Sequence, residues 1–287
     1  MIWQLRTRRI EPGDKPILMG IGNVTPDSFS DGGQFYTPVG KLDIHAAVDF
    51  ALQLIDEGAH IIDVGAESTR PGAKRIDTDE ELRRLIPVVV AIREKTETPI
   101  SVDTSRAVVA REAADAGAEI VNDISGATFD PKMFAVLRET GVGVCLMHIQ
   151  GTPETMQQSP HYDDVVSEVT HWLAGRKQAA LDAGISPERI VLDPGIGFGK
   201  NAEHNVAILQ NIERLHSLGS SLLFGVSRKR FLDTLSGSDN TAQNRLSATI
   251  AVTLFLASHG VQIFRVHDVG EINRALTAWQ FITRNRT

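Results

Sequence analysis

The feature that most constrains the fold is a unit that occurs eight times along the chain. In each unit a short run of β-forming residues ends on a polar side chain and precedes a stretch with helical character. The eight runs cover residues 17–23, 61–65, 100–104, 120–123, 144–148, 190–195, 222–227 and 263–268. Strict alternation of strands and helices predicts an α/β fold with a parallel sheet. Eight alternating pairs predict a closed (β/α)8 TIM barrel, in which the carboxyl ends of all strands meet at one rim.

The predicted barrel occupies residues 17–287 as a single domain, after a short N-terminal extension over 1–16. In the extension, Pro12, Gly13 and Pro16 exclude a long helix. An open doubly wound sheet is the alternative fold. Its first turn would carry a G-x-G-x-x-G pattern, whereas the first strand here ends G-I-G-N.

Helix signals follow the predicted strands. Asp77 or Thr78 is placed to cap one helix, and Gly117, Gly141 and Gly184 follow the ends of three others. The expected helices begin near Asp43 and Glu80 or cover 106–116, 131–139, 163–183, 202–216, 241–258 and 270–283. Two long loops follow the first two strands, over 25–41 and 66–79. We expect these to be active-site loops, because long loops in a compact domain are usually functional or disordered.

Composition excludes several classes of protein. A net charge of −7 argues against a nucleic-acid binder that relies on overall attraction. No run approaches the roughly 20 apolar residues of a membrane span, and residues 1–14 lack the apolar core of a secretory signal. The single cysteine, Cys145, lies in an apolar strand, which indicates a buried side chain and a reducing compartment such as the cytoplasm. We therefore expect small-molecule partners, and neither nucleic acid nor a membrane.

Polar side chains at the strand ends are candidate functional residues. Arg265 and His267 share one face of the eighth strand, while Asp103 and Asn122 end the third and fourth. Such groups in a barrel interior need partners or a ligand, because branched apolar side chains normally fill it. The alternative is a structural network that satisfies itself, for example Asp103 paired with Asn122. Asp63 is the weakest candidate, because a bond to the neighbouring loop explains it equally well.

These residues predict a pocket with two sides. Basic and hydrogen-bonding groups from neighbouring units suit phosphate or diphosphate; they are Asn23, Arg70, Ser227, Lys229, Arg265 and His267. Across the barrel, the carboxylates and amide of Asp103, Asn122 and Asp193 suit a heterocycle rich in N–H donors. Phe198 lies among the glycines of segment 193–200 and is expected to pack on another group.

The sequence has little metal-binding character. It contains no H-E-x-x-H motif and no Cys/His array, which argues against structural zinc. A phosphate-bearing substrate commonly arrives with Mg²⁺, which an oxygen donor such as Asn23 suits. A nucleophilic serine has no support either, because nothing in the sequence ties Ser227 to His148 or His267.

Eight ordered segments resemble the dihydropteroate synthase family, pterin-binding enzymes of folate biosynthesis that sulfonamides target. They are NVTPDSFSDGG (23–33), ESTRPG (67–72), SVDT (101–104), NDISG (122–126), MHIQGTPETMQ (147–157), DPGIGFGK (193–200), GVSRKRFL (225–232) and RVHDV (265–269). The resemblance implies a barrel that commonly forms dimers. It also implies a transferase that joins 4-aminobenzoate to 6-hydroxymethyl-7,8-dihydropterin diphosphate and releases pyrophosphate with the help of Mg²⁺.

The resemblance implies roles for single residues as well. Contacts with the pterin would come from Asp103, Asn122, Asp193, Lys229 and Met147. Contacts with the diphosphate would come from Arg70, Arg265, His267 and, through the metal, Asn23. Contacts with the aminobenzoate would come from Phe29, Thr69, Pro71, Phe198 and Ser227. The expected catalytic set is Asp31, Asp103, Lys229, Arg265 and His267, in which Asp31 would help to stabilise a developing cation. Arg230 departs from the small hydroxyl residue of some relatives, and its contact with the aminobenzoate carboxylate stays open.

The implied reaction is a substitution at the pterin methylene carbon, in which the bond to diphosphate breaks largely before the amine attacks. Two rival functions stay open at this point. A barrel that transfers a methyl group from methyltetrahydrofolate to a corrinoid would share Asp103, Asn122 and Asp193 but has no need of ESTRPG or RVHD. A catalytically silent paralogue would act as a binding or partner subunit, and the intact ligand set argues against it.

Overall fold

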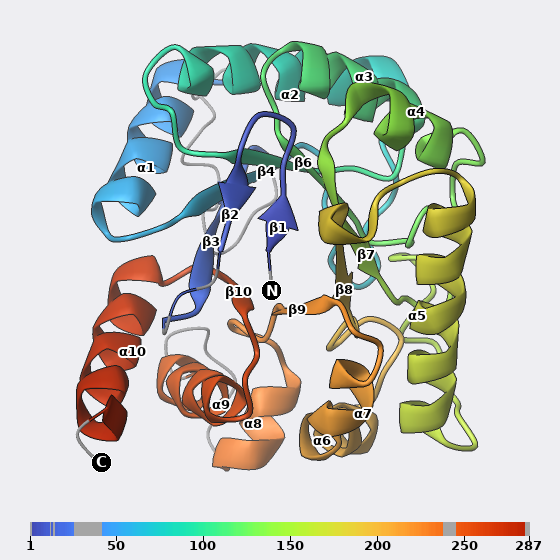
Figure 1. Ribbon diagram of the computed structural model, residues 1–287, viewed down its shortest axis with the longest axis vertical. Helices are drawn as coiled ribbons and strands as arrows, with labels where there is room; N and C mark the ends of the chain where they lie inside the picture. Colours follow the sequence, from blue (N-terminus) through green and yellow to red (C-terminus); the bar gives the residue numbers. More distant parts are fainter. Residues whose placement is uncertain (1, 12, 14, 26–41, 238–244, 285–287) are drawn as a thin grey trace.

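The structure is a computed structural model that describes residues 2–11, 13, 15–25, 42–237 and 245–284. Within these residues eight parallel strands close into a barrel in the order β10-β3-β4-β5-β6-β7-β8-β9, with helices around it (Figure 1). The strands are β3 (Ile17–Asn23), β4 (Ile61–Gly65), β5 (Ile100–Asp103), β6 (Ile120–Asp123), β7 (Gly143–Met147), β8 (Ile190–Asp193), β9 (Ser221–Phe224) and β10 (Ile263–Val266). The predicted TIM barrel is confirmed.

The observed strand bounds agree closely with the sequence pattern. The predicted strands 17–23, 61–65 and 120–123 have the observed bounds, and the other five end one to three residues earlier than predicted. Because β9 and β10 end early, Ser227 and His267 lie in the loops that follow these strands and not in the sheet. Each strand pairs with the next along the chain, and β10 pairs back with β3.

Ten α-helices and one 3-10 turn lie in the described part of the chain. They are α1 (Ile44–Asp56), α2 (Thr78–Arg93), α3 (Ala107–Asp115), α4 (Met133–Thr140), α5 (Val165–Asp182), η1 (Pro187–Arg189), α6 (Ala202–Gln210), α7 (Ile212–His216), α8 (Phe231–Ser236), α9 (Leu246–Ser258) and α10 (Val269–Arg284). Asp77 caps α2 as expected, because its side chain accepts the Glu80 N–H at 2.8 Å. None of the helices in these ranges is long and apolar enough to cross a membrane.

Two helix predictions are wrong. The single helix expected over 202–216 is two helices that break at Asn211, whose Nδ2 donates to the Ala207 carbonyl at 2.8 Å. An asparagine side chain that competes for backbone groups in this way disfavours a continuous helix. The short helix α8 was not predicted; Gly237 ends it in a left-handed conformation. The helix expected over 241–258 begins at Leu246, and 238–244 lie outside the described residues.

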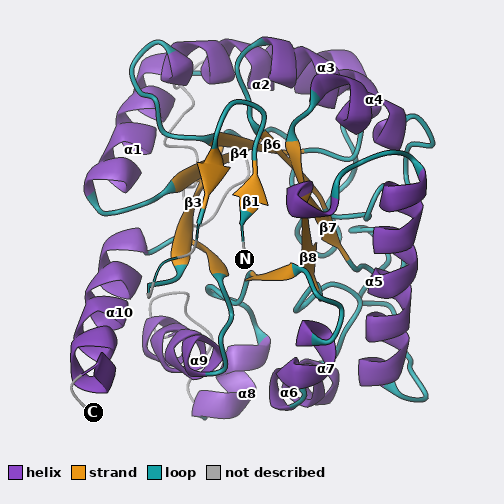
Figure 2. Cartoon of the chain, viewed as in Figure 1, coloured by secondary structure: helices purple, strands orange, loops and turns teal. Residues whose placement is uncertain are grey.

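The N-terminal extension forms a hairpin that closes one end of the barrel. Strands β1 (Trp3–Gln4) and β2 (Arg9–Ile10) pair antiparallel, and Figure 2 shows β1 over the centre of the barrel. Trp3 is 1% exposed and donates its Nε1–H to the Arg189 carbonyl at 3.0 Å. It packs on Met19, Cys145 and other apolar side chains from the strand interiors. Because this end lies at the amino ends of the strands, the opposite rim carries the polar residues.

Candidate active site

Buried carboxylates and one guanidinium meet inside the rim of the barrel. Asp63 in β4, Asp103 in β5 and Asp193 in β8 each have at most 6% of their surface exposed. Arg265 from β10 enters between the first two. Its Nε donates to Asp63 Oδ2 at 2.6 Å and its Nη2 donates to Asp103 Oδ2 at 3.0 Å. Ser101 donates its hydroxyl to the other oxygen of Asp63 at 2.6 Å, so both carboxylate oxygens are engaged.

This network corrects two expectations. Asp63, the weakest candidate on sequence, is fully buried and bonds to Arg265 and Ser101, not to the neighbouring loop. The two sides of the pocket are also not separated across the barrel, because Arg265 of the cationic side bonds to Asp103 of the acidic side. Asn122 Nδ2 lies 3.5 Å from Asp63, so the alternative pairing of Asn122 with Asp103 is not the one observed.

Burial changes the ionisation of the network. It raises the pKa of Asp103 to about 7, against the opposing effect of Arg265. It raises the pKa of Asp193 to about 6, against a hydrogen bond from Gly195 N at 2.7 Å. Burial also disfavours the charge on Arg265, but Asp63 and Asp103 outweigh it and raise the pKa of the guanidinium. The cation therefore persists, while the carboxyls respond to a ligand that donates N–H groups to them.

The glycine-rich segment after β8 depends on backbone that only glycine adopts easily. Gly195, Gly197 and Gly199 have φ angles of 67°, 80° and 63°. A Cβ on Gly195 would lie 1.8 Å from the His148 carbonyl oxygen. The chain therefore turns against the loop after β7 at a distance that excludes a side chain.

A buried lysine holds this segment in place. Lys200 is 2% exposed, and its Nζ donates to the carbonyl oxygens of Gly195 and Phe198, both at 3.0 Å. The third contact is His148 Nδ1 at 2.8 Å. Burial lowers the pKa of Lys200 to about 7, and burial together with Lys200 lowers the pKa of His148 to about 2. The imidazole is therefore neutral, and its Nδ1 shares a hydrogen bond with the Lys200 Nζ.

Phe198 forms part of an apolar ledge beneath a second lysine. The ring packs in a small cluster that includes Met147 and Met156. Lys229 Nζ lies 4.0 Å from the ring centroid, within the range of a cation–π interaction. Burial lowers the pKa of Lys229 to about 8, and Arg265 adds to this effect. The ledge therefore sets a cation directly against a buried aromatic ring.

The turn after β9 brings a serine to a histidine. Ser227 Oγ lies 3.0 Å from His267 Nδ1 and accepts the His267 backbone N–H at 3.2 Å. Between Ser227 and Lys229, Arg228 has a φ of 57°, an unusual conformation for a residue other than glycine. Asp268 holds it there through hydrogen bonds from Nε at 3.0 Å and Nη2 at 2.5 Å. Burial and the cations Arg228 and Arg265 lower the pKa of His267 well below its ordinary range, so its ring is neutral.

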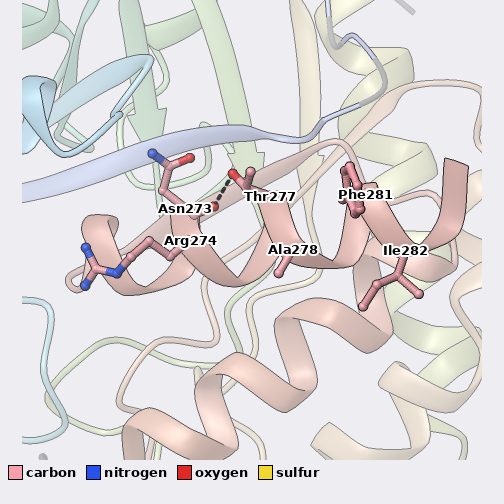
Figure 3. A pocket seen from close by; sticks show the side chains of 6 residues that line it. All are labelled: Asn273, Arg274, Thr277, Ala278, Phe281 and Ile282. Carbon is pink, nitrogen blue, oxygen red and sulfur yellow. Dashed lines mark hydrogen bonds between the residues drawn. The ribbon is translucent and has the colours of Figure 1, made fainter. Parts of the chain in front are cut away.

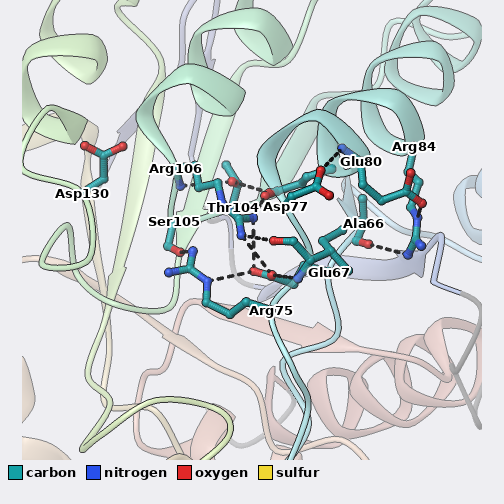
Figure 4. A network of polar contacts seen from close by, with 12 residues as sticks. Ala66, Glu67, Arg75, Asp77, Glu80, Arg84, Thr104, Ser105, Arg106 and Asp130 are labelled. Carbon is teal, nitrogen blue, oxygen red and sulfur yellow. Dashed lines mark hydrogen bonds and ion pairs between the residues drawn. The ribbon is translucent and has the colours of Figure 1, made fainter.

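The loop 66–77, between β4 and α2, has a partly buried base and an exposed tip. Thr69 and Arg70 are half-buried and Pro71 is exposed. At the tip, Gly72 N donates to the Pro153 carbonyl at 2.9 Å, which ties the loop to the segment after β7. At the base, a network of carboxylates and guanidinium groups surrounds Glu67 (Figure 4).

Asn23, at the end of β3, was expected to bind a metal. Its side chain is half-buried, and a Cβ on Gly65 would lie 2.8 Å from its Oδ1. Within the described residues, no group of three or more His, Cys, Asp or Glu side chains could hold a metal ion. Magnesium usually binds proteins through few side chains and keeps water and substrate phosphate as its other ligands, so one amide oxygen fits it. Phe29 and Asp31 lie outside the described residues.

Two residues of the site, Lys200 and Arg228, were not among the sequence candidates, and Arg230 stays peripheral. Lys200 holds the Phe198 carbonyl, and the pairing of Arg228 with Asp268 holds the turn between Ser227 and Lys229. Asp63, the weakest candidate on sequence, lies two residues before the end of β4, and its bond to Arg265 makes it part of the site. For Lys200 and Arg228 no local pattern shows which of several basic residues turns inward. Arg230 is exposed and lies at the N-cap position of α8, without a side-chain capping bond.

Comparisons with known proteins agree on one family. The family described as pterin binding enzyme matches residues 19–267. The dihydropteroate synthase of Escherichia coli (strain K12) is 46% identical over 91% of this chain and 89% of its own length. The Yersinia pestis dihydropteroate synthase in a sulfonamide drug complex has a TM-score of 0.91 and 39% identity, covering 99% of this chain and 100% of that one. The Xanthomonas albilineans dihydropteroate synthase with 4-aminobenzoic acid has a TM-score of 0.88 and 41% identity, covering 98% of both chains.

Proposed function

The chain belongs to the pterin binding enzymes and, within them, to the dihydropteroate synthases. On this premise we propose the reaction that it catalyses and the residues that carry out each part of it. Enzymes of this family are transferases. The proposed reaction joins 6-hydroxymethyl-7,8-dihydropterin diphosphate to 4-aminobenzoate, giving 7,8-dihydropteroate and pyrophosphate. The observation that carries the proposal is the bonded set Asp63–Arg265–Asp103, which sets a fixed cation beside buried acceptors at one rim.

The pterin ring is assigned to the acidic groups. Asp103, Asn122 and Asp193 would accept and donate hydrogen bonds along the edges of the ring, and all three are buried. Met147 would cover one face of the ring, and Lys229 would bind a ring acceptor. A buried carboxyl whose pKa lies near neutrality gains most from a ligand that supplies N–H donors, because the ligand replaces lost hydration.

The diphosphate is assigned to the cationic groups. Arg265, Arg70 and His267 would bind its oxygens, and the neutral His267 ring would act as a hydrogen-bond donor. Arg265 is already oriented by Asp63 and Asp103, so it loses little freedom when the anion arrives. Asn23 would hold Mg²⁺, which when bound neutralises charge on the leaving diphosphate.

The aminobenzoate is assigned to the loop residues and the apolar ledge. Thr69, Pro71, Phe198 and Ser227 would enclose it, together with Phe29. Support comes from the 4-aminobenzoic acid in the X. albilineans enzyme and the sulfonamide drug complex of the Y. pestis enzyme. We propose that sulfonamides inhibit this chain by occupying the same place.

The proposed mechanism is dissociative. The bond between the pterin methylene carbon and the diphosphate oxygen breaks largely before the aniline nitrogen attacks, and the pterin ring delocalises the positive charge. Arg70, Arg265 and His267 stabilise the departing diphosphate, and Asp31 is proposed to stabilise the cation. The aniline nitrogen is mostly unprotonated at neutral pH, so the site needs no strong base. Correct alignment of amine and carbon contributes up to about 7–11 kcal/mol to lowering the barrier.

We also propose a cytoplasmic homodimer. Phe281 and Ile282 of α10 are 73% and 62% exposed, and a shallow apolar hollow runs along this helix (Figure 3). Adjacent large apolar side chains at the surface are typical of an interface. Sedimentation should give a dimer for the wild type and a monomer for Phe281→Glu. A monomeric wild type would contradict this part of the proposal.

A pyrophosphate-release assay with both substrates tests the proposed reaction. We expect release that depends on 4-aminobenzoate, and its loss in Arg265→Ala and Arg265→Lys, with pterin binding still measurable by calorimetry. Arg138→Ala, which removes an exposed guanidinium, is the control. Absence of pyrophosphate from the folded wild type would favour a silent paralogue. Methyl transfer from methyltetrahydrofolate to a corrinoid would favour the other rival.

A further inference from the structure

We propose that Arg106 is a positioning residue for the 4-aminobenzoate site, acting through Glu67 on the loop 66–77. The inference rests on the proposed function, which assigns contacts with the aminobenzoate to Thr69 and Pro71 of this loop. Arg106 lies at the N-cap position of α3 and meets the loop at its base. Its role would be to fix where the tip of the loop stands before substrate binds.

The guanidinium of Arg106 donates hydrogen bonds to three residues, two in the loop 66–77 and one in α2 (Figure 4). It donates to the Glu67 carboxylate at 3.2 and 3.4 Å, to the Glu81 carboxylate and to the Ile76 carbonyl. Glu67 and Ile76 belong to the loop, whereas Glu81 belongs to α2. The side chains of Arg106 and Glu67 are 14% exposed, and that of Glu81 is 1% exposed. A planar guanidinium with five donors is suited to such a junction, and an ammonium is not.

These contacts join the two ends of the loop. Glu67 Oε1 also accepts the Ile76 N–H at 2.8 Å, across nine positions of the sequence. Arg75 adds a second connection, because its Nη2 donates to Ser105 Oγ at 3.0 Å and its Nε lies 3.6 Å from Glu67 Oε2. The turn 104–106 after β5 therefore binds the base of the loop with two consecutive side chains.

The tip of the loop depends on this base for its position. Pro71 and Gly72 are exposed, and Thr69 is half-buried. The bond from Gly72 to Pro153 ties the tip to the opposite side of the site. Holding binding residues in place before the ligand arrives lowers the entropy lost on binding. If the base is released, the loop samples more conformations and the aminobenzoate must order it.

The residues proposed to bind the pterin ring are held by hydrogen bonds that do not involve Glu67. Asp103 is held by Arg265, and Thr104 donates its hydroxyl to Glu81 at 2.6 Å. Removal of Glu67 leaves both bonds in place. The effect should therefore fall on the aminobenzoate and, through Arg70 of the same loop, on the diphosphate, but not on the pterin ring. A general loss of stability would not spare the ring in this way.

The substitution Glu67→Ala tests this idea, because it removes the loop half of the contact and preserves the buried Arg106–Glu81 pair. We expect the KM for 4-aminobenzoate to rise about tenfold, the scale of ordering one or two side chains on binding. The Kd of 6-hydroxymethyl-7,8-dihydropterin, which lacks the diphosphate that Arg70 of the loop is proposed to bind, should stay within about twofold of wild type. Glu67→Gln keeps an acceptor for Ile76 and Arg106 and should recover most of the affinity. Glu139→Ala, which removes a carboxylate from an exposed pair with Arg111, should change neither constant.

Trypsin gives a readout that does not depend on activity. Cleavage after Lys74 and Arg75, followed by mass spectrometry, should be about tenfold faster in substrate-free Glu67→Ala than in wild type and unchanged in Glu139→Ala. Unchanged cleavage would overturn the inference, as would a parallel loss of affinity for 4-aminobenzoate and for the pterin without its diphosphate. A wild type that releases no pyrophosphate would refute the proposed function instead, and the trypsin comparison would still decide whether Glu67 holds the loop.

Discussion

Arg265 Nε lies 2.6 Å from Asp63 Oδ2, although 202 residues separate the two along the chain. Their strands, β10 and β4, are not neighbours, because β3 pairs with both of them. The long arginine side chain therefore crosses in front of β3 inside the barrel. This bond fixes the guanidinium of the network before any ligand arrives, and it makes Asp63 as important to the site as the residues proposed to touch substrate.

Replacement of Asp63 by asparagine should abolish most of the activity while the barrel still folds. Asp63→Asn keeps the size of the side chain but loses the charge that pairs with Arg265. We expect the free energy of unfolding to fall by about 2–3 kcal/mol, somewhat less than for a completely buried pair, because Arg265 keeps 18% exposure. Pyrophosphate release should fall by at least about a hundredfold, since the cation loses its orientation. Asp56→Asn, the same change at an exposed position of α1, is the control; equal activity in both variants would contradict the prediction.

Binding of the pterin should depend on pH through Asp103. Burial raises the pKa of this carboxyl to about 7, so the free site holds a proton below that pH. Because N–H donors of the ligand favour the carboxylate, the proton must leave, and affinity should rise as the pH increases through about 7. Calorimetry of pterin binding between about pH 5 and pH 8 would measure this. Asp103→Asn should weaken binding and remove the inflection near 7, whereas an unchanged profile would exclude Asp103 as its source.

A methyl group on Gly195 should be among the most damaging small changes in the chain. In Gly195→Ala the new Cβ would meet the His148 carbonyl oxygen at 1.8 Å, and the φ of 67° adds strain. We expect the free energy of unfolding to fall by at least about 3 kcal/mol. Gly175→Ala is the matched control in α5, where an added Cβ meets no atom within 4 Å. That change should raise stability by about 0.5–1 kcal/mol, and denaturant titration of both variants would test the contrast.

The N-terminal hairpin should unfold together with the barrel. Trp3 is 1% exposed and packs on side chains from the strand interiors, so Trp3→Ala should cost about 3–5 kcal/mol of stability. Ile2→Ala, at a position that is 39% exposed, should cost far less. The unfolding transition of Trp3→Ala should remain single and shift to lower denaturant. A transition at the wild-type midpoint would mean that the hairpin β1–β2 unfolds separately from the barrel.

Much of the candidate site could be anticipated because it depends on local pattern. Period-two alternation places Asp103 and Arg265 on inward faces, and the closed barrel brings strand ends to one rim, where the structure finds these two residues bonded to each other. The same reasoning fails where a choice depends on packing at a distance. Lys200 is one of several lysines next to glycine or polar residues, and its burial follows from the carbonyl groups of Gly195 and Phe198.

The chain by itself determined the order of strands and helices, the strand bounds to within three residues, the start of α1 near Asp43, the cap of α2 at Asp77 or Thr78, and the set of polar residues at the rim. These follow from periodicity and backbone preference, which act over a few residues. Tertiary structure alone decided that Asp63 pairs with Arg265, that Asn211 interrupts a helix, and that Arg106 binds both ends of a loop. Such outcomes depend on the stagger of the barrel and on the reach of long side chains across intervening elements, neither of which leaves a trace in local sequence.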